Sequence, residues 1–228
     1  MMNIIFASTI PKDQHDAVRN ASHFRRWLER TRTAFQLRSV HVRDVGMFGR
    51  RVGFIFVEAE ALHDGQVLPE YAFLRGDSAS ILVVLKCPGL PDRTVLTCEA
   101  RLPIGKADLL SLPAGMVDDG SFDSTALREL GEEIGTDLHV REEQLIHLAT
   151  TWTSPGGCDE AISLFAAEME ASPELIRSLE GRRTGNKAEH EFIEVRVMAL
   201  DDIPKIGMTD AKTLLSYALY RHEHPARS

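Results

Sequence analysis

The spacing of hydrophobic and polar positions along the chain predicts both helices and strands. Between residues 22 and 36, Phe24, Trp27, Leu28 and Phe35 fall on one helical stripe with arginines elsewhere, which is typical of an amphipathic helix. Segments that alternate with a period of two, or that are continuously apolar, predict strands at residues 39–45, 51–62, 70–76, 79–87 and 93–100, and near 144–151, 161–168 and 191–199.

The connections between these segments narrow the topology. The loop "PGLPD" after residue 87 is too short for a crossover, so the strands at 79–87 and 93–100 are expected to pair antiparallel. The stretch "HDGQ" (63–66) is expected to form a hairpin turn. Helices and strands do not alternate regularly, and neither GxGxxG nor GxxxxGK[ST] occurs. The fold class predicted is therefore α+β, a mixed-sheet sandwich rather than a doubly wound sheet.

Two further helices are expected in the second half of the chain. One covers residues 124–134. The other, "TDAKTLLSYALYRHE" (209–223), is expected to begin at a Thr209 or Asp210 cap and to bury Leu214, Leu215, Ala218 and Leu219.

Composition limits the classes of function. The 228 residues are 43% hydrophobic and 26% charged, as in a soluble globular protein, and the formal net charge of −8 provides no basic surface for a nucleic-acid polymer. No apolar run approaches the roughly 18 residues that a membrane span needs. The three cysteines form no CxxC pair, and the N-terminus lacks a basic segment before its apolar patch. A cytoplasmic protein without a membrane partner is expected.

The stretch "LRELGEEIG" (127–135) has two readings. As a helix it places Leu127, Leu130 and Ile134 on one apolar stripe, with Gly135 at the C-terminal end. Arg128 and Glu132 are spaced to pair at i, i+4.

This reading leaves the other acids unexplained. Glu129 and Glu133 form a like-charge i, i+4 pair, which costs a few tenths of a kcal/mol on an isolated helix, roughly. Gly131 inside the helix costs up to about 1 kcal/mol relative to alanine. Clustered carboxylates are the ligands that Mg²⁺ or Mn²⁺ prefers, and the Ala114 carbonyl in the loop "LPAGMVDDGSF" would add a neutral oxygen. From the helix alone, a solvated face and a metal site both remain open.

The whole stretch "GMVDDGSFDSTALRELGEEIGT" resembles the Nudix box, G-x5-E-x7-R-E-U-x-E-E-x-G-U, in which U is a bulky apolar residue. Three positions depart from it: Gly115 and Arg128 are thirteen positions apart rather than fourteen, Ser121 stands where the first Glu is expected, and Thr136 replaces the last apolar residue. The residues that follow the pattern are Gly115, Arg128, Glu129, Leu130, Glu132, Glu133 and Gly135.

Motifs outside the box extend the resemblance to residues 38–222. The stretches "FLRGDSASILVVL", "EARLPIGK", "SPGGCDE", "HEFIEV" and "DAKTLLSYALY" are similar, in this order, to those of ADP-sugar pyrophosphatases, and most similar to the plant-type ADP-sugar diphosphatases. The resemblance implies a Nudix fold and Mg²⁺-dependent hydrolysis, with Mn²⁺ as a substitute, of ADP-glucose or ADP-ribose to AMP and a sugar 1-phosphate.

The resemblance also implies roles for individual residues. The metal would be bound by Glu129, Glu133, Glu132 and the Ala114 carbonyl. The catalytic residues would be Glu132 and the base Glu191, with Glu194 as the fallback for the base. The substrate would be bound by Arg75, Arg101, Ser154, Gly156 and Glu160.

The expected organisation is an N-terminal arm of residues 1–45, a Nudix domain of residues 46–222 and a tail of residues 223–228. The arm is expected to build a homodimer, as N-terminal strands commonly do in the family. Two alternatives remain: a Nudix enzyme for UDP-sugars or another nucleoside diphosphate derivative, and a nucleotide-sugar binder without activity. Metal-dependent turnover separates the second alternative from an enzyme.

Overall fold

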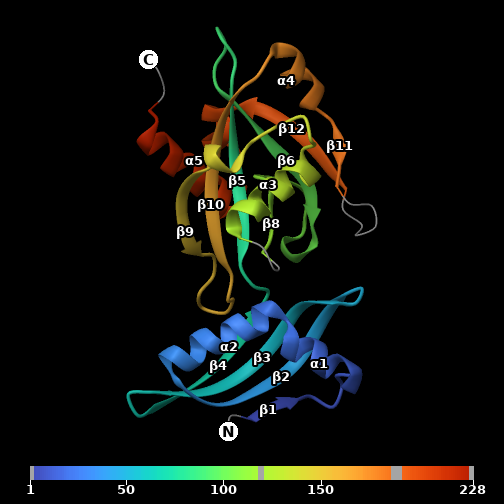
Figure 1. Cartoon of the computed structure of the whole chain (residues 1–228), viewed down its shortest axis with the longest axis vertical. Helices are drawn as coiled ribbons and strands as arrows, with labels where there is room; N and C mark the ends of the chain where they lie inside the picture. Colours follow the sequence, from blue (N-terminus) through green and yellow to red (C-terminus); the bar gives the residue numbers. More distant parts are fainter. Residues whose placement is uncertain (1–2, 118–120, 186–191, 226–228) are drawn as a thin grey trace. The chain divides into compact units, whose positions relative to one another are not determined.

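The computed structural model of the protein describes residues 3–117, 121–185 and 192–225 (Figure 1). Contacts divide the chain into two compact units. Unit 1 comprises residues 1–77 and 152–161, and unit 2 comprises residues 78–151 and 162–228. Residue 45, where the predicted arm ends, lies inside a strand of unit 1.

Unit 1 is a four-stranded sheet with two helices. The strand order is β1-β2-β3-β4, in which β1 is parallel to β2 and the other pairs are antiparallel. The hairpin predicted at 63–66 is confirmed, because His63 pairs with Gln66 across the β3–β4 turn. The elements are β1 (Asn3–Phe6), α1 (Lys12–Asn20), α2 (Ser22–Ala34), β2 (Gln36–Phe48), β3 (Arg51–His63) and β4 (Gln66–Leu74).

The helix predicted at residues 22–36 is confirmed as α2, with a shorter C-terminal end. Phe24 and Leu28 are buried and pack on the sheet residues Val40 and Ile55. Phe35 does not continue the stripe, because its backbone is extended and its side chain is partly exposed. The sequence analysis missed α1, of which only Val18 is buried.

Unit 2 contains a mixed sheet with the order β11-β12-β6-β5-β10-β9, to which β7 is added beside β6 and β8 beside β5. The antiparallel β5–β6 pair is confirmed, and β5 is parallel to β10. The strands are β5 (Ser78–Lys86), β6 (Arg93–Arg101), β7 (Lys106–Ser111), β8 (Ala114–Met116), β9 (Ile146–Trp152), β10 (Ala161–Glu170), β11 (Arg183–Thr184) and β12 (Ile193–Ala199). The helices are α3 (Phe122–Glu133), α4 (Pro173–Leu179) and α5 (Ala211–Glu223), with 3₁₀ segments at Leu102–Ile104, Glu142–Gln144 and Leu200–Lys205.

The central strand β5 is continuously apolar from Ile81 to Leu85 because both of its faces are covered. On one face, Ile81 and Val83 pack with Leu130 of α3 and with α4. On the other face, Leu82 and Val84 pack in a second cluster with α5. A mixed sheet with helices on both faces confirms the predicted α+β class.

The predicted buried face of α5 is wrong. The buried residues are Thr213, Ser216 and Tyr220, whereas Leu214 is 41% exposed. Polar anchors set the rotation of this helix. The Asp210 carboxylate accepts the Thr213 N–H at 3.0 Å, and the Thr213 hydroxyl accepts the N–H of Leu112 at 3.0 Å. A prediction from hydrophobicity alone therefore identified the wrong side of the helix. None of the residues predicted to be buried is fully buried: Leu214, Leu215, Ala218 and Leu219.

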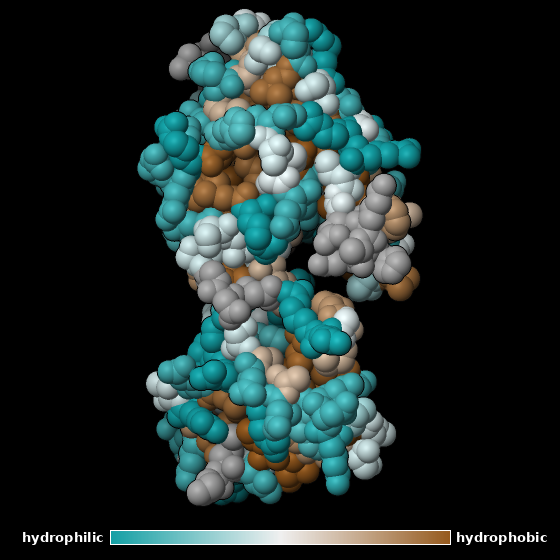
Figure 2. All heavy atoms as spheres, turned by 45° about the vertical axis from the view of Figure 1, so that its right-hand side comes forward, coloured by the Kyte–Doolittle hydropathy of each residue, from teal (hydrophilic) through white to brown (hydrophobic). Residues whose placement is uncertain are grey.

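Within the described residues, no helix combines the length and the apolar character required to span a membrane. The face drawn in Figure 2 is mostly hydrophilic, with hydrophobic residues visible as brown patches among the teal ones.

Candidate active site

The N-terminus of α3 explains one departure from the box. Ser121 is the N-cap: its hydroxyl accepts the N–H of Ser124 at 3.2 Å, and the Ser124 hydroxyl accepts the N–H of Ser121 at 3.1 Å. This reciprocal pair is a capping box, and it satisfies two backbone donors at the helix start. The residue that replaces the expected Glu therefore has a local structural role.

The apolar face of α3 differs from the prediction by one residue. Leu130 and Ile134 are buried as expected, but Ala126 is fully buried in place of Leu127, which is only partly covered. At the other end Gly135 follows the C-cap with φ 121°, a conformation that favours glycine.

The acidic face of α3 is also buried, against β8. Glu129 is 9% exposed and Glu133 is 7% exposed. A Cβ atom added to Gly115 would lie 1.8 Å from Oε1 of Glu129, so only glycine lets β8 pass this close to the carboxylate. The N–H of Ala114 donates to Oε2 of Glu133 at 3.1 Å. Both carboxylates are therefore held at defined positions by the strand beside the helix.

Electrostatics at Glu133 favour a cation. Burial, followed by the negative charges of Glu129 and Glu99, raises the pKa of Glu133 well above its ordinary value. The N–H of Ala114 and the charge of Lys212 offset only part of this effect. A divalent ion would relieve the repulsion, and carboxylate oxygens are the donors that Mg²⁺ prefers. The chemistry of this donor set therefore fits a hard divalent cation.

Glu132 lies on a different side of the helix. Its side chain is 58% exposed, and its Oε2 is 2.8 Å from Nη1 of Arg128, the pair expected from the spacing. Nη2 of Arg128 is 2.5 Å from Oε1 of Glu129. The structure thus brings together two of the three predicted acids. No group of three or more His, Cys, Asp or Glu side chains within the described residues forms a ready-made metal cluster.

Glu99 and Lys212 were not identified from the sequence. Glu99 lies two residues before Arg101 at the end of β6, and its Oε1 is 2.5 Å from Nη2 of Arg101. The spacing gave no reliable signal for Glu99, because Arg101 lies just beyond the strand predicted at 93–100 and the β6–β7 register shifts between the two residues. Lys212 comes from α5, and no local spacing connects it to Glu133. Among the predicted residues, Arg101 is therefore near an acid that acts on Glu133.

The predicted base Glu191 lies outside the described residues. Its fallback Glu194 lies in β12, opposite Cys98 of β6. Oε1 of Glu194 is 2.9 Å from Nη2 of Arg196. The assignment of the base stays a prediction.

The remaining substrate residues, Arg75, Ser154, Gly156 and Glu160, belong to unit 1. The carbonyl of Ser154 accepts the N–H groups of Gly157 and Cys158 at 3.2 and 2.9 Å, which closes a turn that contains Gly156. The Gly157 carbonyl accepts the N–H of Phe73 in β4 at 2.8 Å.

This turn places Glu160 beside Arg75. Nη1 of Arg75 is 3.5 Å from Oε1 of Glu160, and the hydroxyl of Thr153 donates to Oε2 of Glu160 at 3.0 Å. Two of the predicted substrate residues are therefore neighbours, although they are 85 positions apart in the sequence.

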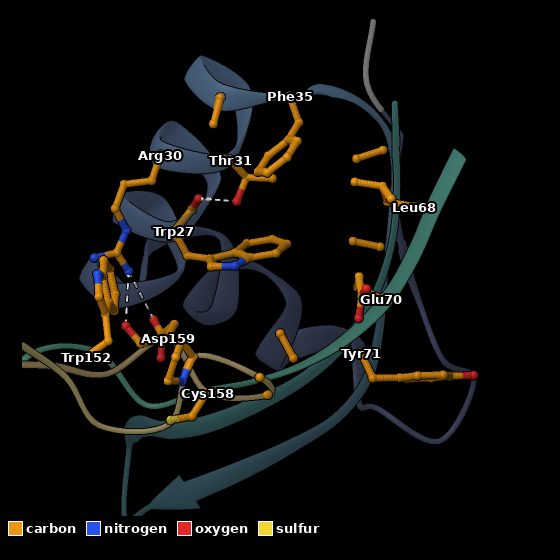
Figure 3. A pocket seen from close by; sticks show the side chains of 17 residues that line it. Trp27, Arg30, Thr31, Phe35, Leu68, Glu70, Tyr71, Trp152, Cys158 and Asp159 are labelled. Carbon is orange, nitrogen blue, oxygen red and sulfur yellow. Dashed lines mark hydrogen bonds and ion pairs between the residues drawn. The ribbon is translucent and has the colours of Figure 1, made fainter. Parts of the chain in front are cut away.

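Unit 1 also contains a pocket of about 670 Å³, within the usual size range of small-molecule sites (Figure 3). All its lining residues belong to this unit: they come from α2 and the following Phe35, from β3 and β4, and from residues 152–159. The indole of Trp27 points into the pocket, whereas the ring of Tyr71 points away from it.

Comparisons with known proteins bear on the family and the fold. Residues 77–217 match the family model of the NUDIX domain. The chain is 36% identical to Nudix hydrolase 14, chloroplastic, of Arabidopsis thaliana over 91% of this chain and 72% of the relative. It is 30% identical to the ADP-ribose pyrophosphatase of Bacillus subtilis (strain 168) over 72% of this chain and 89% of the relative. A solved ADP compounds hydrolase aligns with a TM-score of 0.55 and 16% identity over 83% of this chain and 93% of its own, a likeness of fold alone.

Proposed function

This chain belongs to the Nudix family, and we propose that it hydrolyses the diphosphate bond of ADP-sugars in a reaction that depends on Mg²⁺. ADP-glucose would give AMP and glucose 1-phosphate. The sugar 1-phosphate expected above does not hold for ADP-ribose, whose second ribose is linked through its 5-oxygen and would leave as ribose 5-phosphate. The observation that carries the proposal is the buried acid pair Glu129 and Glu133, because an isolated helix has no need for two repelling carboxylates out of water. Relatives named as an ADP-ribose pyrophosphatase and a Nudix hydrolase support the choice of substrate class.

The charges of the chain explain why a cation is required. The protein carries a formal charge of −8, and the proposed substrate is itself an anion. Glu129, Glu133 and the Ala114 carbonyl would hold the metal, with Glu132 reached directly or through water. When bound, Mg²⁺ supplies positive charge that offsets the diphosphate and activates water.

The chain's own residues would perform the remaining steps. Arg101 would donate hydrogen bonds to phosphoryl oxygens, where negative charge increases during the reaction. Glu191 would accept a proton from the attacking water. Arg75, Ser154, Gly156 and Glu160 would bind the nucleotide sugar.

The test is AMP or UMP release from ADP-glucose, ADP-ribose and UDP-glucose, with Mg²⁺, with Mn²⁺ and with EDTA. Glu133→Gln is expected to abolish metal-dependent turnover, whereas Glu143→Gln, at an exposed acid of a 3₁₀ segment, is expected to leave it unchanged. Strongest turnover on UDP-glucose would replace the proposed substrate. Tight binding of these nucleotide sugars without turnover under any divalent metal would make the protein a binder instead of an enzyme.

We also propose a homodimer built by unit 1, to which residues 1–45 contribute. Outward-facing aromatic residues of its sheet support this: Phe56 pairs with Phe73 across β3 and β4, and both are 40% exposed. Tyr71, 57% exposed, stacks on Phe56 with ring centroids 5.7 Å apart. An exposed aromatic cluster is typical of an interface. A single species with the mass of one chain in sedimentation equilibrium would contradict the dimer.

We place the protein in the cytoplasm. Cys87, Cys98 and Cys158 are all free, which suits a reducing compartment. Fractionation of the source cells would test this assignment.

A further inference from the structure

Asp159 is a buried carboxylate in the turn that holds Glu160. Its side chain is 2% exposed. Its Oδ1 accepts two backbone hydrogen bonds, from the N–H of Arg75 at 2.8 Å and from the N–H of Gly76 at 3.0 Å. One carboxylate oxygen therefore ties residue 159 to the chain segment that carries Arg75.

Arg30 of α2 holds the same carboxylate from the other side (Figure 3). Its Nη2 donates to the carbonyl oxygen of Asp159 at 3.3 Å and lies 3.7 Å from Oδ2 of that residue. Its Nη1 donates to Oδ1 of Asp77 at 3.3 Å, and its guanidinium lies 4.9 Å from the ring centre of Trp152. Arg30 thus connects α2 to Trp152 and Asp159, which lie on either side of the turn, and to Asp77.

We propose that Asp159 and Arg30 are positioning residues, which fix Arg75 and Glu160 in the geometry needed to bind the substrate. The proposal rests on the function proposed above, because it assumes that Arg75 and Glu160 contact the nucleotide sugar.

The chemistry of the four groups supports a positioning role. Arg75 is restrained at its backbone by Asp159 and at its guanidinium by Glu160. Its Nε is buried without a hydrogen-bond partner among the described residues, so the side chain is enclosed at its base while Nη1 is paired with Glu160. Fixing an arginine before the substrate arrives reduces the ordering that binding would otherwise require.

The types of residue also fit the role. A carboxylate is needed at position 159 to accept two N–H groups and to balance the Arg30 charge at the same time. A planar guanidinium is needed at position 30, because only its fork reaches Asp77 and Asp159 together while it stacks on Trp152.

Two substitutions of Asp159 separate its contributions. Asp159→Ala removes the acceptor of both backbone N–H groups, and we expect kcat/KM for the preferred ADP-sugar to fall about 10- to 100-fold, mainly through KM. Asp159→Asn keeps an oxygen acceptor and loses only the charge, so its effect is expected to be smaller. Arg30→Lys keeps the charge and loses the fork, and Arg25→Ala, at an exposed arginine of the same helix, is the control expected to match the wild type.

A double-mutant cycle with Arg75→Ala tests whether Asp159 acts through Arg75. If it does, kcat/KM of the double variant is no lower than that of the less active single variant. Independent losses that multiply in the double variant would overturn the proposal. So would an Asp159→Ala protein that is less stable to urea but has the wild-type KM, since that result describes a purely structural residue.

Amide hydrogen exchange gives a readout that does not need activity. In Asp159→Ala the amides of Arg75 and Gly76 are expected to exchange faster than in the wild type, whereas amides of β10 are not; unchanged exchange at both residues refutes the positioning contact. If the wild type releases no product with any divalent metal, the proposed function fails, and the exchange experiment still decides whether Asp159 orders this segment.

Discussion

Gly115 offers a sharp test of whether the position of Glu129 matters for activity. In Gly115→Ala the new Cβ would lie 1.8 Å from Oε1, 1.9 Å from Cδ and 2.6 Å from Cγ of Glu129. Real Cβ atoms do not approach so closely, and Gly115 is held in β8 by its pairing with Ala79 of β5. The Glu129 side chain must therefore move, because it is more easily displaced than two paired strands.

The size of the effect follows from this displacement. Crowding a packed site typically costs about 1–3 kcal/mol, and we expect the lower part of this range because a side chain can rotate away. The expected effect on activity is larger. A shift of about 1 Å at a reacting group typically costs about 100-fold in rate, and the carboxylate must move at least this far.

Gly131 provides the matched control. It lies in α3 itself, and a Cβ added there would meet no atom within 4 Å. Gly131→Ala is therefore expected to stabilise the protein by about 0.5–1 kcal/mol, through the higher helix propensity of alanine, and to leave turnover unchanged. Urea unfolding and the initial rate of AMP release with Mg²⁺ measure both quantities. A Gly115→Ala protein with kcat/KM within twofold of the wild type would refute the assignment of Glu129 to the reacting site.

Three further outcomes are expected. Burial and neighbouring charge raise the pKa of Glu133 in the folded protein above its unfolded value, so stability is lost as the pH rises through the folded pKa. Without metal, Glu133→Gln should therefore have a higher Tm than the wild type at pH 7, but not under acidic conditions. Mg²⁺ should raise the Tm of the wild type more than that of the variant. Tyr220→Phe removes the hydrogen bond to Glu168 and should lower the free energy of unfolding by about 1–2 kcal/mol at pH 7. Because burial and this bond raise the pKa of Tyr220, wild-type stability falls above about pH 10, and the difference between the two proteins should shrink there. A difference that stays the same above about pH 10 would show that the contact does not affect this titration. Ser121→Ala removes the N-cap of α3 and should cost about 1 kcal/mol in urea unfolding, and a loss below a quarter of this would contradict the capping role.

The sequence predicted best those features that depend on neighbouring residues. The amphipathic period identified α2, and the uninterrupted apolar run identified β5 as a strand. The short Pro/Gly loop correctly indicated the antiparallel β5–β6 pair. For α3, the like-charge pair Glu129 and Glu133 marked a face that hydrophobicity did not explain, and the structure shows that this face is buried.

Features that depend on distant residues were not predicted. The buried side of α5 is set by the bond between Thr213 and Leu112, which are 101 positions apart, so its leucines gave the wrong answer. Lys212 influences Glu133 for the same reason, through tertiary contact alone. The helix α1 was missed because its nine residues include only two apolar side chains, Ala17 and Val18, too few to mark a helical stripe.

The two faces of α3 have opposite effects on stability, and the sequence of the helix reflects both. The core side, with Leu130 and Ile134, holds the helix on β5. The acidic side places Glu129 and Glu133 against β8, where their mutual repulsion destabilises the metal-free protein. Stability alone gives no reason to bury two carboxylates side by side, since burial penalises their charged forms and each repels the other. In the proposed metal site a bound cation would turn this repulsion into ligation, so the same two acids that destabilise the metal-free protein would stabilise the metal-bound one.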